Sequence, residues 1–135
     1  MDLSKLKFLV VDGDETARNH IESLLQKLGA IRVDKATQGK EALHKIKKSY
    51  SDGMPYALIA LEWELSEISG FDILKTIRED RDMRSAVIMM ISSKSDTESL
   101  KAIASLFPDT YVVKPFTEEV FEQKFRLLYP KFSKV

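Results

Sequence analysis

Four short apolar runs, each closed by a charged or hydroxyl residue, constrain the fold of this chain more than any other feature. The runs and their closing residues are 8–11 with Asp12, 56–61 with Glu62, 86–91 with Ser92, and 111–113 with Lys114. Uninterrupted runs of this length are typical of strands that are buried on both faces, as in a parallel sheet. The stretch 31–34 alternates apolar and polar residues instead, which predicts an exposed edge strand.

Segments with the apolar spacing of a helix separate these runs. In the first segment Ala17, Ile21 and Leu24 share one helical face, and Gly29 is placed to end the helix. Four further segments cover 42–46, 71–77, 100–107 and 120–128, with Ser95 and Glu98 spaced as a capping box for the fourth helix and Thr117 as the N-cap of the fifth. This five-fold alternation predicts an α/β fold, in which helices cover both faces of a parallel sheet.

Size and composition narrow the class of protein. A length of 135 residues predicts one domain over 1–135, with its core at about 6–129 and a tail that frays from Pro130 to Val135. The 21 basic and 21 acidic residues leave no net charge, so neither a nucleic-acid partner nor a membrane-surface role is expected. The absence of cysteine excludes disulfides and thiolate chemistry. No apolar run is long enough to span a bilayer and no signal-peptide pattern is present, so we expect a cytoplasmic protein.

Polar residues collect at the carboxyl ends of the predicted strands. Asp12 and Asp14 follow the first strand, Glu62 and Glu64 end the third, Ser92 ends the fourth and Lys114 ends the fifth. Each residue alone has an ordinary structural role, and Asp14 in particular suits the N-cap of the first helix. Because parallel strands end at the same edge of a sheet, however, we expect these side chains to meet in one site.

This arrangement resembles the receiver domain of two-component response regulators, over Lys7 to about Leu128. The residues that carry the resemblance are the run 8–12, Gly70 eight residues after the third strand, Ser92, and the Tyr-Val-Val-Lys-Pro-Phe motif at 111–116. The resemblance implies a flavodoxin-like (βα)5 doubly wound sandwich with strand order 2-1-3-4-5. It also implies a signalling module and not an enzyme.

The resemblance assigns roles to several residues. In a receiver domain the third strand ends in an aspartate that takes a phosphoryl group from a histidine kinase, and two acids after the first strand help to hold Mg²⁺. A serine or threonine ends the fourth strand, a lysine ends the fifth, and an aromatic residue shortly before that lysine changes rotamer. Ser92, Lys114 and Tyr111 match the last three roles, and the Lys114–Pro115 peptide is expected to be cis as in the family.

Two departures from the family pattern affect the phosphorylation chemistry. The phosphoacceptor position is Glu62, whose extra methylene moves the carboxylate by roughly 1.5 Å, and a misplacement near 1 Å can cost about 10²-fold in rate. Gly13 replaces the second acid after the first strand, so Asp12, Glu62 and Glu64 remain as weak candidate ligands and tight Mg²⁺ binding is not expected. We therefore predict a pseudo-receiver that needs no cofactor.

The predicted function is a phosphorylation-independent protein-interaction module. Glu62 would keep a negative charge beside Ser92 and Lys114 and favour an inward Tyr111. Partners, or a second copy of the chain, would bind the face formed by the fourth helix, the fifth strand and the fifth helix. The aromatic residues near this end of the chain belong either to that surface or to the core; they are Phe116, Phe121, Tyr129 and Phe132.

Three alternatives remain from the sequence. A Glu62–Lys114 salt bridge would lock an inert scaffold. A weakly phosphorylatable receiver would use Glu62, or one of Asp12, Asp14 and Glu64. A small-molecule site at the same strand ends is disfavoured, because the acidic residues at 12–14 would repel phosphate.

Overall fold

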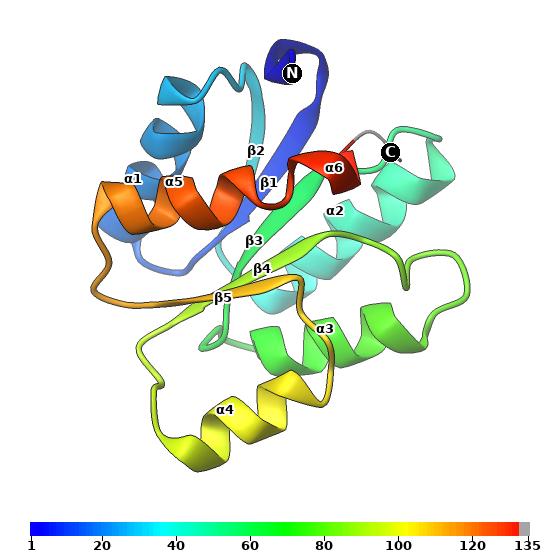
Figure 1. Cartoon of the computed structure of the whole chain (residues 1–135). Helices are drawn as coiled ribbons and strands as arrows, with labels where there is room; N and C mark the ends of the chain where they lie inside the picture. Colours follow the sequence, from blue (N-terminus) through cyan, green and yellow to red (C-terminus); the bar gives the residue numbers. More distant parts are fainter. Residues whose placement is uncertain (133–135) are drawn as a thin grey trace.

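A five-stranded parallel sheet lies at the centre of the computed structural model, which describes residues 1–132 (Figure 1). The strands are β1 (Lys7–Val11), β2 (Arg32–Ala36), β3 (Leu58–Glu62), β4 (Ile88–Ser92) and β5 (Thr110–Val113). Their order in the sheet is β2-β1-β3-β4-β5 and every neighbouring pair is parallel. This confirms the predicted flavodoxin-like topology.

Helices cover both faces of the sheet. They are η1 (Leu3–Lys5), α1 (Glu15–Lys27), α2 (Gly39–Ser51), α3 (Gly70–Glu79), α4 (Thr97–Ala104), α5 (Glu118–Arg126) and α6 (Tyr129–Phe132). The helices α1 and α5 lie on one face, and α2, α3 and α4 lie on the other (Figure 1). No helix in the described part of the chain combines the length and the hydropathy needed to cross a membrane.

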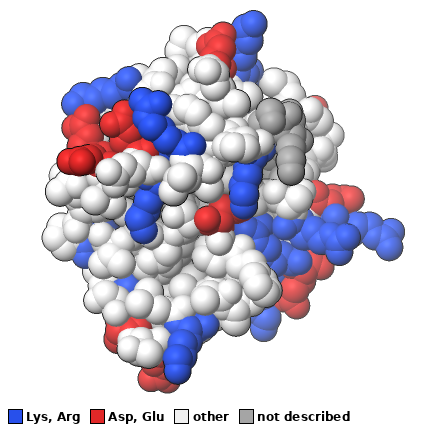
Figure 2. Space-filling view, in the orientation of Figure 1, with Lys and Arg blue, Asp and Glu red and all other residues white. Residues whose placement is uncertain are grey.

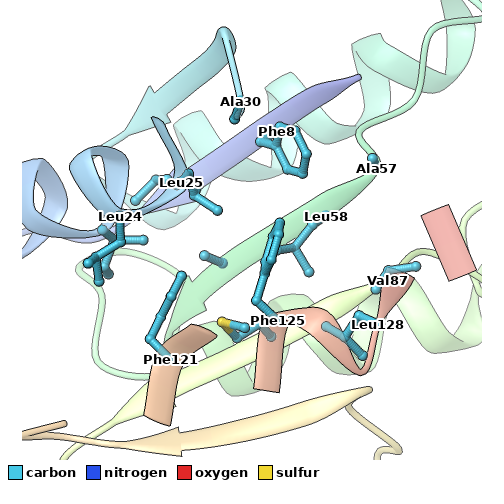
Figure 3. Close-up of a cluster of buried hydrophobic side chains, with 14 of the residues drawn as sticks. Phe8, Leu24, Leu25, Ala30, Ala57, Leu58, Val87, Phe121, Phe125 and Leu128 are labelled. Carbon is cyan, nitrogen blue, oxygen red and sulfur yellow. The ribbon is translucent and has the colours of Figure 1, made fainter. Parts of the chain in front are cut away.

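The central strands are buried on both faces, which explains their uninterrupted apolar sequence. Successive side chains of a strand point to opposite faces, so Phe8 packs under α1 and α5 while Leu9 packs under the helices of the other face. On the first face Phe125 meets Phe8 with ring centroids 6.1 Å apart, among the side chains drawn in Figure 3. The edge strand β2 differs, since Arg32 and Asp34 are exposed while Ala36 is buried.

Polar caps fix the starts of the helices. Asp14 accepts the backbone N–H of Ala17 at 2.9 Å, and Thr117 accepts that of Val120 at 3.1 Å, as predicted. The prediction of a capping box at Ser95 is wrong: Asp96 is the N-cap of α4 and accepts the N–H of Ser99 at 3.0 Å. An aspartate caps as well as a serine and adds a charge that favours a helix N-terminus. Gly29 follows the end of α1 at φ +116°, as its predicted role requires.

The prediction that the tail frays from Pro130 onward is wrong for residues 130–132, which are ordered in a helix. Residues 129–132 form α6, and the Phe132 side chain is buried with its ring edge-on to Phe8 at 5.9 Å. Phe121 is also buried, while Phe116 and Tyr129 are half-buried against the same cluster, so these four aromatic residues belong to the core. A helical turn that inserts one aromatic ring keeps more apolar area from water than a solvated tail would. The last three residues of the predicted tail lie outside the described part.

Candidate functional site

The carboxyl edge of the sheet brings together four of the predicted residues. Lys114 Nζ lies 2.8 Å from Asp12 Oδ2 and 3.5 Å from Glu62 Oε1. Ser92 ends β4 beside them and is fully buried. The convergence predicted from the strand ends is therefore present, and it is centred on one ammonium group between two carboxylates.

Asp12 is held from several sides. Its backbone N–H donates to the Ala36 carbonyl at 3.1 Å, and its own carbonyl accepts from Arg18 Nη1 at 3.0 Å. Its carboxylate accepts the Asp14 N–H at 2.9 Å in addition to the Lys114 contact. Only 4% of its side chain is exposed. A buried carboxylate of this kind is stable because each oxygen has a donor.

The side chain of Glu62 is long enough for its two carboxylate oxygens to reach different partners. Its Oε2 turns back to accept the N–H of Trp63 at 3.2 Å, and its Oε1 faces Lys114. Twelve per cent of the side chain is exposed. Both oxygens of the Glu62 carboxylate thus already have partners within the protein.

The charges at this edge are not balanced. Burial raises the pKa of Glu62, and the nearby Asp12 carboxylate raises it further, although Lys114 acts in the opposite direction. Burial alone would lower the pKa of Lys114, but its hydrogen bond to Asp12 and the charge of Glu62 outweigh burial and raise it. One ammonium group serves two carboxylates, and it lies closer to Asp12.

Replacing Glu62 by glutamine is expected to change how stability depends on pH. Because the folded protein holds the Glu62 proton more tightly than the unfolded chain does, Glu62 contributes stability at low pH that is lost as pH rises from about 4.5 through the folded pKa. The variant lacks this loss, so its free energy of unfolding relative to wild type should increase between acidic and neutral pH. Urea unfolding at both pH values measures this, with Glu64→Gln as the control for removing one carboxylate. A relative stability of Glu62→Gln that falls with pH would contradict the assignment.

Two predicted members of the acidic pocket lie apart from it. Asp14 is exposed and serves as the cap of α1. Glu64 is exposed and pairs with Lys94 at 3.4 Å. Within residues 1–132, no group of three or more histidine or acidic side chains is arranged to hold a metal ion. Asp12, Glu62 and Glu64, the weak metal candidates, are therefore not gathered in one cluster.

The loop after β4 is held to Ser92 and Tyr111 through Lys94, which sequence reasoning missed. Ser92 Oγ accepts the N–H of Lys94 at 3.1 Å, and the Tyr111 hydroxyl donates to the Lys94 carbonyl at 2.8 Å. The Lys94 side chain then reaches Glu64 and lies 5.5 Å from the centroid of the Trp63 ring. A loop lysine carries no sequence signal that distinguishes this role, beyond its position two residues after Ser92.

Glycines set the position of the loop between β3 and α3. Gly70 donates its N–H to the Trp63 carbonyl at 2.7 Å, which places the start of α3 directly against the end of β3. Gly39, at the start of α2, donates to the Ser66 carbonyl at 3.1 Å. A Cβ atom at Gly39 would lie 2.0 Å from the Ile68 carbonyl oxygen, so α2 holds this loop by close backbone contact. The Lys114–Pro115 peptide is cis, as predicted.

Comparison with known proteins agrees with this geometry. A profile of the family described as response regulator receiver domain matches residues 8–126. The chemotaxis protein CheY-3 of Vibrio cholerae is 29% identical over 126 residues, which cover 93% of each chain. A response regulator receiver domain from Francisella superimposes with a TM-score of 0.81 at 24% identity, covering 94% of this chain and 98% of that one.

A receiver domain of a sensor histidine kinase from Pseudomonas aeruginosa, solved with a magnesium ion in its active-site cleft, also shares the fold. Its TM-score is 0.77 at 20% identity, and the match covers 95% of this chain and 98% of that one. The likeness to the two solved structures shows the common fold. The family match over most of the chain, together with the convergence of Asp12, Ser92 and Lys114, makes this protein a member of the response regulator receiver domain family of two-component signalling.

Proposed function

We propose that this receiver domain works as a protein-interaction module that does not depend on phosphorylation. The observation that carries the proposal is the Glu62 carboxylate, which stands at the phosphoacceptor position with Oε1 facing Lys114 and Oε2 bonded to the Trp63 N–H. An attacking carboxylate oxygen must lie in line with the phosphorus atom. A carboxylate displaced by a methylene and held on both oxygens is poorly placed for that attack.

The surroundings also argue against a tight Mg²⁺ site. Mg²⁺ takes near-octahedral oxygen ligands, usually with one or two carboxylates. Gly13 provides no side chain, and the remaining acid Asp12 already has Lys114 Nζ at 2.8 Å. A cation would have to displace this ammonium group, so we propose that Mg²⁺ binding is weak or lost.

The switch residues support a fixed arrangement. Ser92 and Tyr111 hold the backbone of Lys94 from both sides, so the loop after β4 is placed without any phosphoryl group. The negative charge of Glu62 lies next to Lys114 in the same way that a phosphoryl group would. We propose that these contacts keep one signalling conformation.

The interaction surface that we propose is formed by α4, β5 and α5. It exposes Leu100, Val113 and Val120, each with between 37% and 38% of its surface accessible. A hollow of about 320 Å³ between α4 and β5 includes Leu100, Ile103 and Tyr111 in its lining. Because Tyr111 belongs both to this hollow and to the switch contacts, the conformation at the site is transmitted to the surface. The expected occupant is another signalling protein or a second copy of the chain.

Treating the protein with acetyl phosphate and Mg²⁺ tests the proposal. We expect no mass gain by intact-mass spectrometry, no Mg²⁺ quenching of the single tryptophan, Trp63, and an unchanged sedimentation profile. Trp63 directly follows Glu62 and therefore reports on the site. A gain of one phosphoryl group, or saturable quenching by Mg²⁺, would return the protein to conventional phosphorelay signalling.

A second candidate is an inert scaffold, favoured by the Glu62–Lys114 ion pair. The Glu62→Gln variant distinguishes the two candidate functions. A module that depends on the Glu62 charge would lose its partner or dimer contact in this variant. An inert scaffold would keep it.

A further inference from the structure

A second hollow lies at the opposite edge of the sheet, far from Glu62 in the topology. It is bounded by the ends of α2 and α3, by the chain entering β4, by the loop between α4 and β5, and by α6. Its volume is about 590 Å³, within the range of about 300–1,000 Å³ that is common for small-molecule pockets. Its lining includes Tyr50, Arg78, Arg84, Phe107, Asp109 and Lys131.

Aromatic side chains form part of the wall. Phe107 is 75% exposed although it is a large apolar residue, and its backbone is in the left-handed region at φ +55°. Bulky residues rarely adopt this conformation, and such sites are often functional. The Phe107 N–H donates to the Ala104 carbonyl at 3.1 Å and the Phe107 carbonyl accepts from Arg78 Nε at 3.0 Å, so the backbone of this residue is held on both sides. The half-buried Tyr50, near the end of α2, also lines the hollow.

Arg78 lines the hollow but has little capacity for a ligand, because its donors are already used. Its Nη1 donates to the carbonyls of Ala86 at 2.7 Å and Arg84 at 3.0 Å, and its Nη2 donates to Asp109 at 3.0 Å. Asp109 in turn accepts the N–H of Ile88 at 2.7 Å. The Arg78–Asp109 pair is thus a structural clamp between α3 and the start of β5.

Positive charge exceeds negative charge around this clamp. Among the described residues that line the hollow, Asp109 is the one acid, and it already pairs with two of the three cations, Arg78 and Lys131. Within residues 1–132 the Arg84 guanidinium has no hydrogen-bond or ion-pair partner. At the right of Figure 2, where the loop between α3 and β4 projects, basic side chains lie beside acidic ones. An unpaired guanidinium that lines the same hollow as the exposed Phe107 ring is a combination that suits an anion attached to a flat apolar group.

We propose that this hollow binds a small organic anion. Its ring would lie against Phe107 and Tyr50, and its carboxylate or phosphate group would contact Arg84 and Lys131. Phe107 and Pro108 also line the hollow between α4 and β5. A ligand that binds here and moves the Phe107 ring would therefore alter the proposed interaction surface, although it binds at the edge of the sheet opposite Glu62. The existence of the site does not depend on the proposed function.

Amide NMR titrations of the full chain with phenyl phosphate, benzoate and inorganic phosphate test this. We expect saturable shifts at 78–87 and 106–109 with an aromatic anion, and weaker binding of inorganic phosphate. Saturation by phenyl phosphate alone indicates a phosphate ester, and saturation by both aromatic anions indicates organic acids in general; either result supports the site. No saturable shift, or equal affinity for inorganic phosphate, would overturn it.

Two variants and one control locate the binding. Arg84→Ala should weaken aromatic-anion binding by about tenfold, because it removes a charge-assisted contact. Arg81→Ala removes an exposed arginine that does not line the hollow and should leave the affinity unchanged. Phe107→Gly relieves the positive φ, so it should fold while losing preference for aromatic over inorganic anions. Equal effects of Arg84→Ala and Arg81→Ala would refute the proposal, as would an unchanged preference in Phe107→Gly.

Discussion

Replacing Gly70 by alanine is expected to lower the free energy of unfolding by about 3 kcal/mol. The added Cβ would lie 2.0 Å from the Glu62 carbonyl oxygen, 2.8 Å from its carbonyl carbon and 3.0 Å from the Trp63 Cα. All three atoms are backbone, so no side chain can turn away to make room. The start of α3 cannot retreat either without losing the Gly70 hydrogen bond to Trp63. Urea unfolding followed by circular dichroism measures the loss.

Gly13→Ala is the matched control for this substitution. The nearest atom to a Cβ at Gly13 is the Thr37 carbonyl oxygen at 3.4 Å, at the edge of ordinary contact. Its expected effect is within about 1 kcal/mol of wild type. If both variants unfolded at the same urea concentration, the close contact of α3 with the end of β3 would be disproved. The contact of Gly70 with the end of β3 also fixes the backbone of Glu62, so this residue of the family motif helps to position the site.

Placing aspartate at positions 13 and 62 is expected to produce the other large effect. The double variant Gly13→Asp with Glu62→Asp should become phosphorylated by acetyl phosphate in the presence of Mg²⁺, at a rate at least about 10²-fold above wild type. The shorter side chain at position 62 withdraws the carboxylate from Lys114 and Trp63, and the new acid at 13 supplies a second metal ligand. Space for a side chain exists at Gly13, while Ser92 and Lys114 are already in place. Intact-mass spectrometry over a time course gives the rate.

The control for this gain is Gly13→Asp with Glu62→Gln, which carries the added metal ligand but has no carboxylate at position 62. It should bind Mg²⁺ and remain unmodified. If the aspartate double variant also stayed unmodified while binding Mg²⁺, the loss of chemistry would lie elsewhere, and the loop over Ser66 and Ile68 that contacts Gly39 would be the next region to change.

The convergence of Asp12, Glu62, Ser92 and Lys114 could be predicted from the sequence because strand direction makes it unavoidable. Each continuous apolar run marks a strand that is buried on both faces, and parallel strands present their last residues at one edge. Local chemistry likewise determined the caps at Asp14 and Thr117 and the end of α1 at Gly29. These features depend on neighbours in the sequence, or on the direction of a strand.

Contacts between distant segments were decided only by the tertiary structure. Whether Lys114 lies closer to Asp12 or to Glu62, and whether Glu62 turns back to Trp63, depends on side-chain rotamers in a shared space. The contacts of Lys94, the place of Arg84 in the lining of the hollow and the burial of Phe132 likewise depend on loops and helices that meet only after folding. Hydrophobic periodicity records which face of an element is buried, but it carries no information about which residue of another element will lie opposite.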